Sequence, residues 1–258
     1  MILLFIIPLL LFGSELKICH KAYYLIFPVA YNCTVYKLEG EKITIKAYTT
    51  NEGLGKILGN VEMKGVSSGS LLKSHLFKLY MNIRDSVREH LYLFKNNRVY
   101  YVIKGKEEKR GFLKAPPCDP LRAGLFLYIT ASERESTIEF FYDGKKQEVL
   151  YRVVGRETLE WKGKVYKTFK ILVKPKVKTK GLLKPKGEWF VWIDEETLIP
   201  IRLKVSFTLG SVNMWIDKLE GDTKFFVSLK QSLEQTPLKA LTGLESKVFQ
   251  TYQSFGDT

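Results

Sequence analysis

Residues 188–203 read EWFVWIDEETLIPIRL, two apolar segments that flank a short acidic one. Successive side chains of a strand point to opposite sides, so the residues before Asp194 are apolar on both faces of the expected strand. After Pro200, apolar residues alternate with polar ones up to residue 207, which is typical of a strand with one buried face. The stretch therefore predicts a β-hairpin within an antiparallel sheet.

The three consecutive acids, Asp194, Glu195 and Glu196, raise the alternative of a catalytic carboxylate cluster. A glycosidase-like pair needs carboxylates that face each other across a cleft, one of them in an environment that raises its pKa. Neighbouring acids at the tip of a hairpin do not predict that geometry. An Asp at the start of a turn accepts hydrogen bonds from the following backbone amides, and charges are well solvated there. We interpret the acids as a turn.

The two-residue period continues through most of the chain. It is longest in 147–161 and 164–179, which are joined by the tight turn Lys162-Gly163, and Gly155 indicates a bend or bulge. Further strands are expected at 33–38, 42–49, 88–95, 99–104, 137–142, 200–208, 212–219 and 224–230. Roughly a dozen strands joined by mostly short turns predict a mainly β, antiparallel meander.

Two helices are expected to interrupt the meander. Asp119-Pro120 has the pattern of an N-cap followed by proline at the first helical position, and apolar residues continue at helical spacing to Ala131. Thr236-Pro237 repeats the signal before a C-terminal apolar stripe at residues 238–252. Residues 53–74 are rich in Gly and Ser and predict either a loop or a short helix over one opening of the sheet.

The N-terminus has the composition of an export signal. Residues 2–12, ILLFIIPLLLF, are all apolar, and Gly13 and Ser14 follow. The run is shorter than the ~20 residues that span a bilayer and has the length of a signal-peptide core. An uncleaved N-terminal anchor is the alternative. We expect a signal or anchor at 1–14, a β domain at 15–230 and a C-terminal amphipathic helix at 231–258.

Cysteine and histidine offer little chemistry in the sequence. Two of Cys19, Cys33 and Cys118 can pair in an exported protein, and the sequence does not choose the pair. His20, His75 and His90 lack partners at metal-ligand spacing. The chain has no nucleophile elbow and no phosphate-binding glycine loop. We therefore expect no catalytic residues, no metal and no cofactor.

Basic residues dominate the charge. The net charge is +14, and such a chain either meets polyanions or has a Lys/Glu-rich surface suited to high temperature. The densest cationic run is Lys170, Lys174, Lys176 and Lys178, followed by further lysines to residue 186. This run is either a solvated face or a site for an anionic surface. Aromatic residues that stack on bases are sparse there, so no nucleic acid is expected.

Four tryptophans are candidates for an apolar site: Trp161, Trp189, Trp192 and Trp215. Aromatic side chains in a β protein commonly serve as core packing. A sheet that is apolar on both faces at 189–193 nevertheless needs a cover on its second side. Either a helix or an apolar ligand can supply that cover.

Several motifs together resemble the exported bacterial family called domain of unknown function 3108, which is similar in fold to outer-membrane lipoprotein carriers. They are Asp119-Pro120-Leu121, Tyr142-Asp143-Gly144-Lys145, Val153 to Glu157, the hairpin from Trp192 through Pro200 to Arg202, and Gly210. The resemblance covers roughly residues 25–220, by the order of these motifs. It implies a curved antiparallel sheet, an open or half barrel, with a helix against its concave side. It carries over no catalytic residues.

The sequence thus predicts a periplasmic or cell-envelope protein that is not an enzyme. It would bind a lipid or another apolar ligand in the concave face through the four tryptophans. The alternative is a structural protein that docks an envelope partner or an anionic lipid surface through its lysines.

Overall fold

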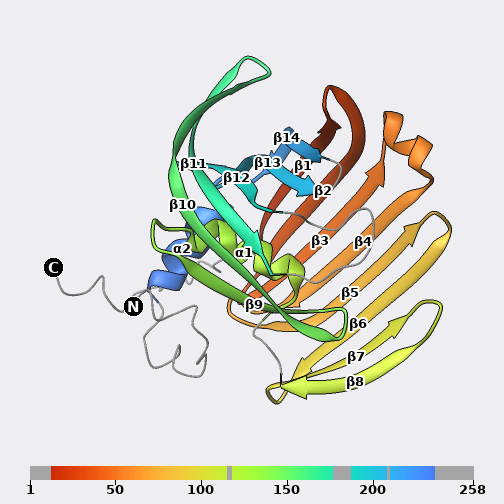
Figure 1. Cartoon of the computed structure of the whole chain (residues 1–258). Coiled ribbons are helices and arrows are strands. Elements are labelled where there is room, and N and C mark those ends of the chain that lie inside the picture. Colours follow the sequence, from red (N-terminus) through yellow and green to blue (C-terminus); the bar gives the residue numbers. More distant parts are fainter. Residues whose placement is uncertain (1–12, 115–117, 177–186, 208–209, 236–258) are drawn as a thin grey trace, which may run out of the picture.

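Fourteen strands form one antiparallel sheet in the computed structural model, which describes residues 13–114, 118–176, 187–207 and 210–235 (Figure 1). The strands are β1 (Ser14–Tyr24), β2 (Phe27–Glu39), β3 (Lys42–Asn51), β4 (Val61–Gly69), β5 (Ser74–Ile83), β6 (Ser86–Lys95), β7 (Arg98–Lys104), β8 (Lys109–Lys114), β9 (Ser136–Tyr142), β10 (Lys145–Trp161), β11 (Lys164–Pro175), β12 (Trp189–Asp194), β13 (Pro200–Phe207) and β14 (Gly210–Gly221). The helices are η1 (Gly53–Leu58), α1 (Pro120–Thr130) and α2 (Phe225–Glu234).

The strand order is β8-β7-β6-β5-β4-β3-β2-β1-β14-β13-β12-β11-β10-β9. Strands that are consecutive in sequence pair with each other, except β8 and β9, and the pairing of β1 with β14 joins the two halves of the sheet. The sheet curls around α1, which lies inside the curve, and β8 and β9 remain as its two edges (Figure 1). The mainly β, curved meander with a helix on its concave side is confirmed.

Apolar side chains of α1 fill the concave side. Leu125 and Ile129 are buried in one cluster with Ile43 and Ile45 from the first half of the sheet and Ile171 from the second. Phe225, Phe226, Leu229 and Leu233 of α2 join the same cluster. The concave face is therefore covered by the protein's own side chains.

A buried carboxylate fixes the start of α1. Asp119 is fully buried, and one of its oxygens accepts hydrogen bonds from the backbone N–H groups of Leu121 and Arg122. The other oxygen accepts 2.6 Å bonds from the hydroxyls of Ser67 and Ser74, which lie on β4 and β5. The buried Arg122 guanidinium donates to the carbonyls of Ile43 and Ser70. The helix is thereby attached to three strands.

The opening hairpin is a turn, as predicted. Asp194 accepts hydrogen bonds from the Glu196 and Thr197 backbone amides at 3.2 and 2.9 Å, and from the Thr197 hydroxyl at 2.8 Å. The Leu198 amide donates to the Asp194 carbonyl. The predicted turn at Lys162-Gly163 has positive φ angles, as do the turns Asn96-Asn97 and Asp143-Gly144, and the register of β10 shifts at Gly155.

Some predicted elements were wrong. Residues 224–230 are not a strand, because Phe225, Leu229 and Leu233 recur at the helical spacing of four and are buried on one face of α2. In 53–74 the short helix is η1, but β4 occupies residues 61–69. The expected boundary at 230/231 falls inside α2. Of the leader expected at 1–14, residues 1–12 lie outside the described residues, as does the C-terminal stripe at 238–252.

Cys19 and Cys33 form a disulfide between the paired strands β1 and β2. Cys118 is a free, buried thiol next to α1. The structure thus selects one of the pairings that the sequence left open.

Replacing Asp119 by Ala should lower the free energy of unfolding by about 3 kcal/mol or more, because it removes an N-cap and leaves two buried hydroxyls without an acceptor. Asp222→Ala is the matched control, since Asp222 accepts from the Lys224 amide near the start of α2 but is partly exposed. It should cost about 1 kcal/mol. Equal losses in urea unfolding would contradict the role assigned to Asp119.

Candidate functional site

The structure brings three of the four predicted tryptophans together. The rings of Trp161 and Trp215 stack with centroids 4.7 Å apart. The Arg202 guanidinium lies between Trp215 and Trp192, 4.7 and 4.5 Å from their ring centroids. The Lys170 ammonium group also lies over the Trp192 ring, 5.4 Å from the ring centroid. Trp192 and Trp215 therefore pack against cations from neighbouring strands, and Trp161 packs on Trp215.

This stack does not lie on the concave side. Ile193 lines a small cavity together with Tyr128 of α1, so its side chain faces the helix, and the adjacent Trp192 must point to the opposite face. Trp189 lies three residues before Trp192, so its side chain points to the helix side of β12. The four tryptophans thus occupy both faces of the sheet rather than one pocket.

The described lysines of the cationic run are neutralised. Lys170 pairs with Glu157 at 2.6 Å, Lys174 with Glu188 at 3.1 Å and Lys176 with Glu148 at 3.4 Å. Lys178 lies outside the described residues. Each of these three cations already has an acidic partner, which weakens the interpretation of the run as a bare anion-binding stripe.

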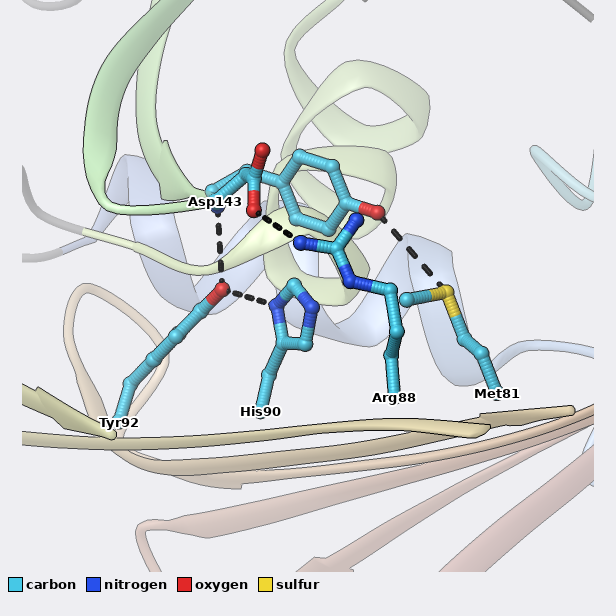
Figure 2. A network of polar contacts seen from close by, with 6 residues as sticks. Met81, Arg88, His90, Tyr92 and Asp143 are labelled. Carbon is cyan, nitrogen blue, oxygen red and sulfur yellow. Dashed lines mark hydrogen bonds and ion pairs between the residues drawn. The ribbon is translucent and has the colours of Figure 1, made fainter. Parts of the chain in front are cut away.

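A polar network joins the β5–β6 region to the turn between β9 and β10. Figure 2 shows Tyr92 in contact with both His90 and Asp143: its hydroxyl accepts a 3.1 Å bond from the Asp143 amide and shares a hydrogen bond with the His90 ring. Arg88 forms a 3.0 Å ion pair with the Asp143 carboxylate. Met81 contacts the Tyr142 hydroxyl. This network draws one end of the sheet toward the β9–β10 hairpin.

Histidine is a common general acid or base, but the pKa of buried His90 does not suit that role at neutral pH. Burial, assisted by the charge of Arg88, lowers the pKa of His90 to about 4, so the ring is neutral at pH 7. Burial likewise lowers the pKa of His20, whose ring bonds the Pro200 carbonyl, to about 4. Among the described residues, no group of three or more His, Cys, Asp or Glu side chains is arranged to hold a metal ion. We assign the network a structural role.

A candidate ligand site is a groove on the other face of the same strands. It has a volume of about 580 Å³. We call it the outer groove. It is lined by Lys64, Val66, Lys78, Leu79, Tyr80, Glu89, His90, Leu91, Val102, Lys104 and Arg110. Lys78, Leu91 and Val102 are directly paired across β5, β6 and β7. Leu79 and His90 alternate with these residues, so their side chains point to the helix side.

The outer groove combines an apolar floor with a cationic rim. Val66, Tyr80, Leu91 and Val102 supply the floor. The rim holds four cations, Lys64, Lys78, Lys104 and Arg110, and one acid, Glu89. Lys64 and Arg110 pair with Glu62 and Glu108, which lie outside the lining, so Lys78 and Lys104 are the cations of the rim without an ion pair among the described residues. Such a groove suits a molecule with an apolar body and an anionic group.

An exposed apolar row extends this floor. Leu93 pairs with Tyr100, and Tyr100 pairs with Phe112 on the edge strand β8. These side chains are 48%, 41% and 61% exposed. Exposed apolar residues that are contiguous, rather than scattered, mark interaction surfaces.

A second cavity lies on the helix side, between α1, α2 and β10–β12, and has a volume of about 210 Å³. Ligand pockets commonly measure about 300–1,000 Å³. The outer groove falls within that range and this cavity falls below it, so the outer groove is the stronger candidate.

Sequence reasoning missed the outer groove, although a signal was present. The runs LYLF at 91–94 and VYYVI at 99–103 are apolar on both strand faces, next to a sheet edge. An antiparallel sheet with one solvated face alternates apolar and polar residues. These runs therefore indicate a second apolar surface, as residues 189–193 do.

The fold and the groove define the class as an open, barrel-like antiparallel β protein whose concave side is filled by a helix. Among the described residues, no helix combines the length and apolarity needed to cross a bilayer. The chain belongs to the family described as protein of unknown function (DUF3108), whose model matches residues 19–217. This confirms the resemblance noted in the sequence.

A solved structure supports the same fold. The chain is similar to a beta-barrel-like protein of domain of unknown function DUF1849 from Brucella abortus, with a TM-score of 0.53 and 8% identity, over 81% of this chain and 98% of that chain. At this identity the likeness shows the fold alone. The comparison with curated proteins found no match.

Trp192→Ala should lower the free energy of unfolding by about 3–5 kcal/mol, because the ring is buried and packs between Lys170 and Arg202. Replacing Glu195 and Glu196 together by Gln should change it by less than about 0.5 kcal/mol, since both lie in a turn. Urea unfolding of the three proteins tests the contrast. A large loss for the double variant would restore the acids as more than a turn.

Acid should destabilise the protein between pH 6.5 and 4. Because His20 and His90 have a pKa of about 4 when folded and about 6.5 when unfolded, the unfolded chain binds more protons in this window. Stability is thus full above pH 6.5 and falls as the pH drops. From pH 6.5 to 5 each histidine should account for up to about 2 kcal/mol.

Urea unfolding at several pH values checks this slope. His90→Gln should reduce the slope between pH 7 and 5, because it removes one of the two buried rings. A parent protein with constant stability over this range would contradict the neutral, buried state of the two rings.

Proposed function

We propose that the protein is a non-enzymatic binding protein of the cell envelope, and that it holds an apolar or lipid-like ligand with an anionic group in the outer groove. The single observation that carries the proposal is the groove itself, an apolar floor bordered by four cations and one acid. The volume of about 580 Å³ is enough for a small amphiphile or part of a larger one. The proposed ligand site is therefore on the outer face, and not on the concave face that the sequence suggested, where α1 is packed.

Location in the cell envelope is supported by two features. Residues 2–12 have the length and composition of a signal-peptide core. The Cys19–Cys33 disulfide is a bond that persists in oxidising compartments such as the periplasm.

Docking of an envelope partner through the lysine run has weaker support. Lys170, Lys174 and Lys176 have acidic partners, so a docking anion would have to displace Glu157, Glu188 or Glu148. In the groove, Lys64 pairs with Glu62 and Arg110 pairs with Glu108, but Lys78 and Lys104 form no ion pair among the described residues. These two lysines are therefore the groove cations that an anionic group would meet without displacing an acid.

Native mass spectrometry of the purified protein, followed by organic extraction, tests for a bound lipid. Fluorescent cis-parinaric acid then serves as the probe for affinity. Leu91→Asp should weaken its binding by more than about tenfold, because it places a charge in the apolar floor and repels the carboxylate. Replacing Lys78 and Lys104 by Gln should weaken it by about fivefold, and less at high salt.

Lys170→Gln is the matched control, because Lys170 is a lysine of the same sheet outside the groove, and it should leave the affinity unchanged. Absence of lipid in the extract together with no saturable probe binding would refute the proposal. Equal weakening by Lys170→Gln would place the site elsewhere.

A further inference from the structure

The turn between β1 and β2 exposes apolar side chains where the other tight hairpin turns do not. Leu25 and Ile26 form this turn and are 75% and 80% exposed, and Phe27 next to them is 45% exposed. The other two-residue turns in the described part of the chain are Gly40-Glu41, Arg84-Asp85, Asn96-Asn97, Asp143-Gly144 and Lys162-Gly163. All of these consist of glycine and polar residues.

Turn geometry does not explain the choice of Leu25 and Ile26. Leu25 has φ 55°, a left-handed conformation that Gly and Asn adopt with less strain than leucine. An Asn-Gly pair is compatible with this turn, because Asn tolerates a positive φ and Gly accepts either sign of φ, and it would be soluble. The two apolar residues therefore oppose both local conformation and solvation.

Helix η1 places two more exposed apolar residues beside this turn (Figure 1). Gly53 and Gly55 of η1 approach the backbone of Pro28 and Val29, directly after the β1–β2 turn. On η1, Ile57 is 79% exposed and Leu54 is 45% exposed. The apolar tip, defined as Leu25, Ile26, Phe27, Leu54 and Ile57, is thus one protruding feature at one end of the sheet.

Cations accompany the apolar tip. Lys56 lies between Leu54 and Ile57 in the sequence of η1. Arg84 lies close to the end of η1, because its backbone amide donates a hydrogen bond to the Asn60 carbonyl. The nearby acids are Glu52, which pairs with Lys21, and Asp85 in the same turn as Arg84. The chain as a whole has a net charge of +14.

We propose that the apolar tip inserts into the interfacial layer of an anionic lipid bilayer. Protruding aliphatic side chains fit a fluid apolar phase, whereas a protein partner would need a matching hollow and a well-packed interface of ~1,000 Å² or more. Basic residues beside an inserting segment are attracted by anionic headgroups. This surface is distinct from the outer groove and does not depend on the function proposed for it.

The test follows the environment of the tip itself, in the full chain. Ile26→Cys is labelled with the polarity-sensitive dye NBD, and Cys118 does not compete because it is fully buried. Vesicles of phosphatidylcholine with phosphatidylglycerol should shift the emission to shorter wavelength. The same dye at Asn97→Cys, in the turn between β6 and β7 at the opposite end of the sheet, should not respond.

A second variant separates insertion from folding. Leu25→Asn combined with Ile26→Gly is compatible with the φ angles of the turn and should leave the urea midpoint close to that of the parent. It should lower vesicle binding by about tenfold, because it removes two inserting side chains. Val165→Asn, at a 68% exposed valine near the β10–β11 turn, is the control and should not change binding.

Three outcomes would overturn the proposal. They are absence of vesicle binding by the parent chain, binding during which the dye at position 26 stays in water, and equal binding by the Asn-Gly variant. Equal response to vesicles of phosphatidylcholine alone would overturn the requirement for anionic lipid. Affinity for cis-parinaric acid in the absence of vesicles should be the same in the Asn-Gly variant, so failure of the tip and failure of the groove are distinguishable.

Discussion

The attachment of α1 to the sheet through Asp119 is the constraint on which the rest of the structure depends. A curved sheet with an apolar concave face is stable only when that face is covered. Asp119 gives the cover a fixed position, because the same carboxylate caps the helix and binds hydroxyls on β4 and β5. Since α1 and α2 then fill the concave side, a ligand of the size proposed would have to use the outer face.

The two edge strands of the sheet, β8 and β9, do not pair with each other, so the barrel stays open. Side chains connect the two ends instead. Tyr92 bonds the Asp143 amide, and Phe141 packs on Tyr92 and Tyr101 in a small separate cluster. Because this cluster buries the helix-side residues of β5–β7, their outer side chains are left to form the groove.

Local signals made much of the fold predictable from the sequence. Alternation, the turn pairs Asn96-Asn97 and Asp143-Gly144, and the Asp119-Pro120 cap act within a few residues, so each is visible without tertiary structure. Helix α2 was mistaken for a strand because Phe225, Val227 and Leu229 also satisfy a period of two. Only packing against α1 decides between the two periods over so short a stretch.

The candidate site was less predictable, because it depends on pairs that are distant in sequence. Lys176 appears free in the sequence, yet Glu148 reaches it from the neighbouring strand, 28 residues earlier. Similarly, the sequence shows that Trp192 and Trp215 are apolar but not that Arg202 separates them. The lining of the outer groove depends on the register of five neighbouring strands, β4 to β8. Turn signals in the sequence indicate the register of one hairpin at a time, so they do not show which side chains meet across all five strands.

The register also relates the two proposed surfaces. The groove residue Lys64 lies three residues into β4 from Val61, and η1 with the apolar tip precedes Val61 at that end of the sheet. At a rise of about 3.3 Å per residue, Lys64 is about 10 Å from the end of the strand. A tip held in the headgroup layer would thus place the cationic rim of the groove just above that layer. In this orientation an anionic amphiphile could pass between the bilayer and the groove without leaving basic surroundings, which gives a physical reason for both surfaces to lie at the same end of the sheet.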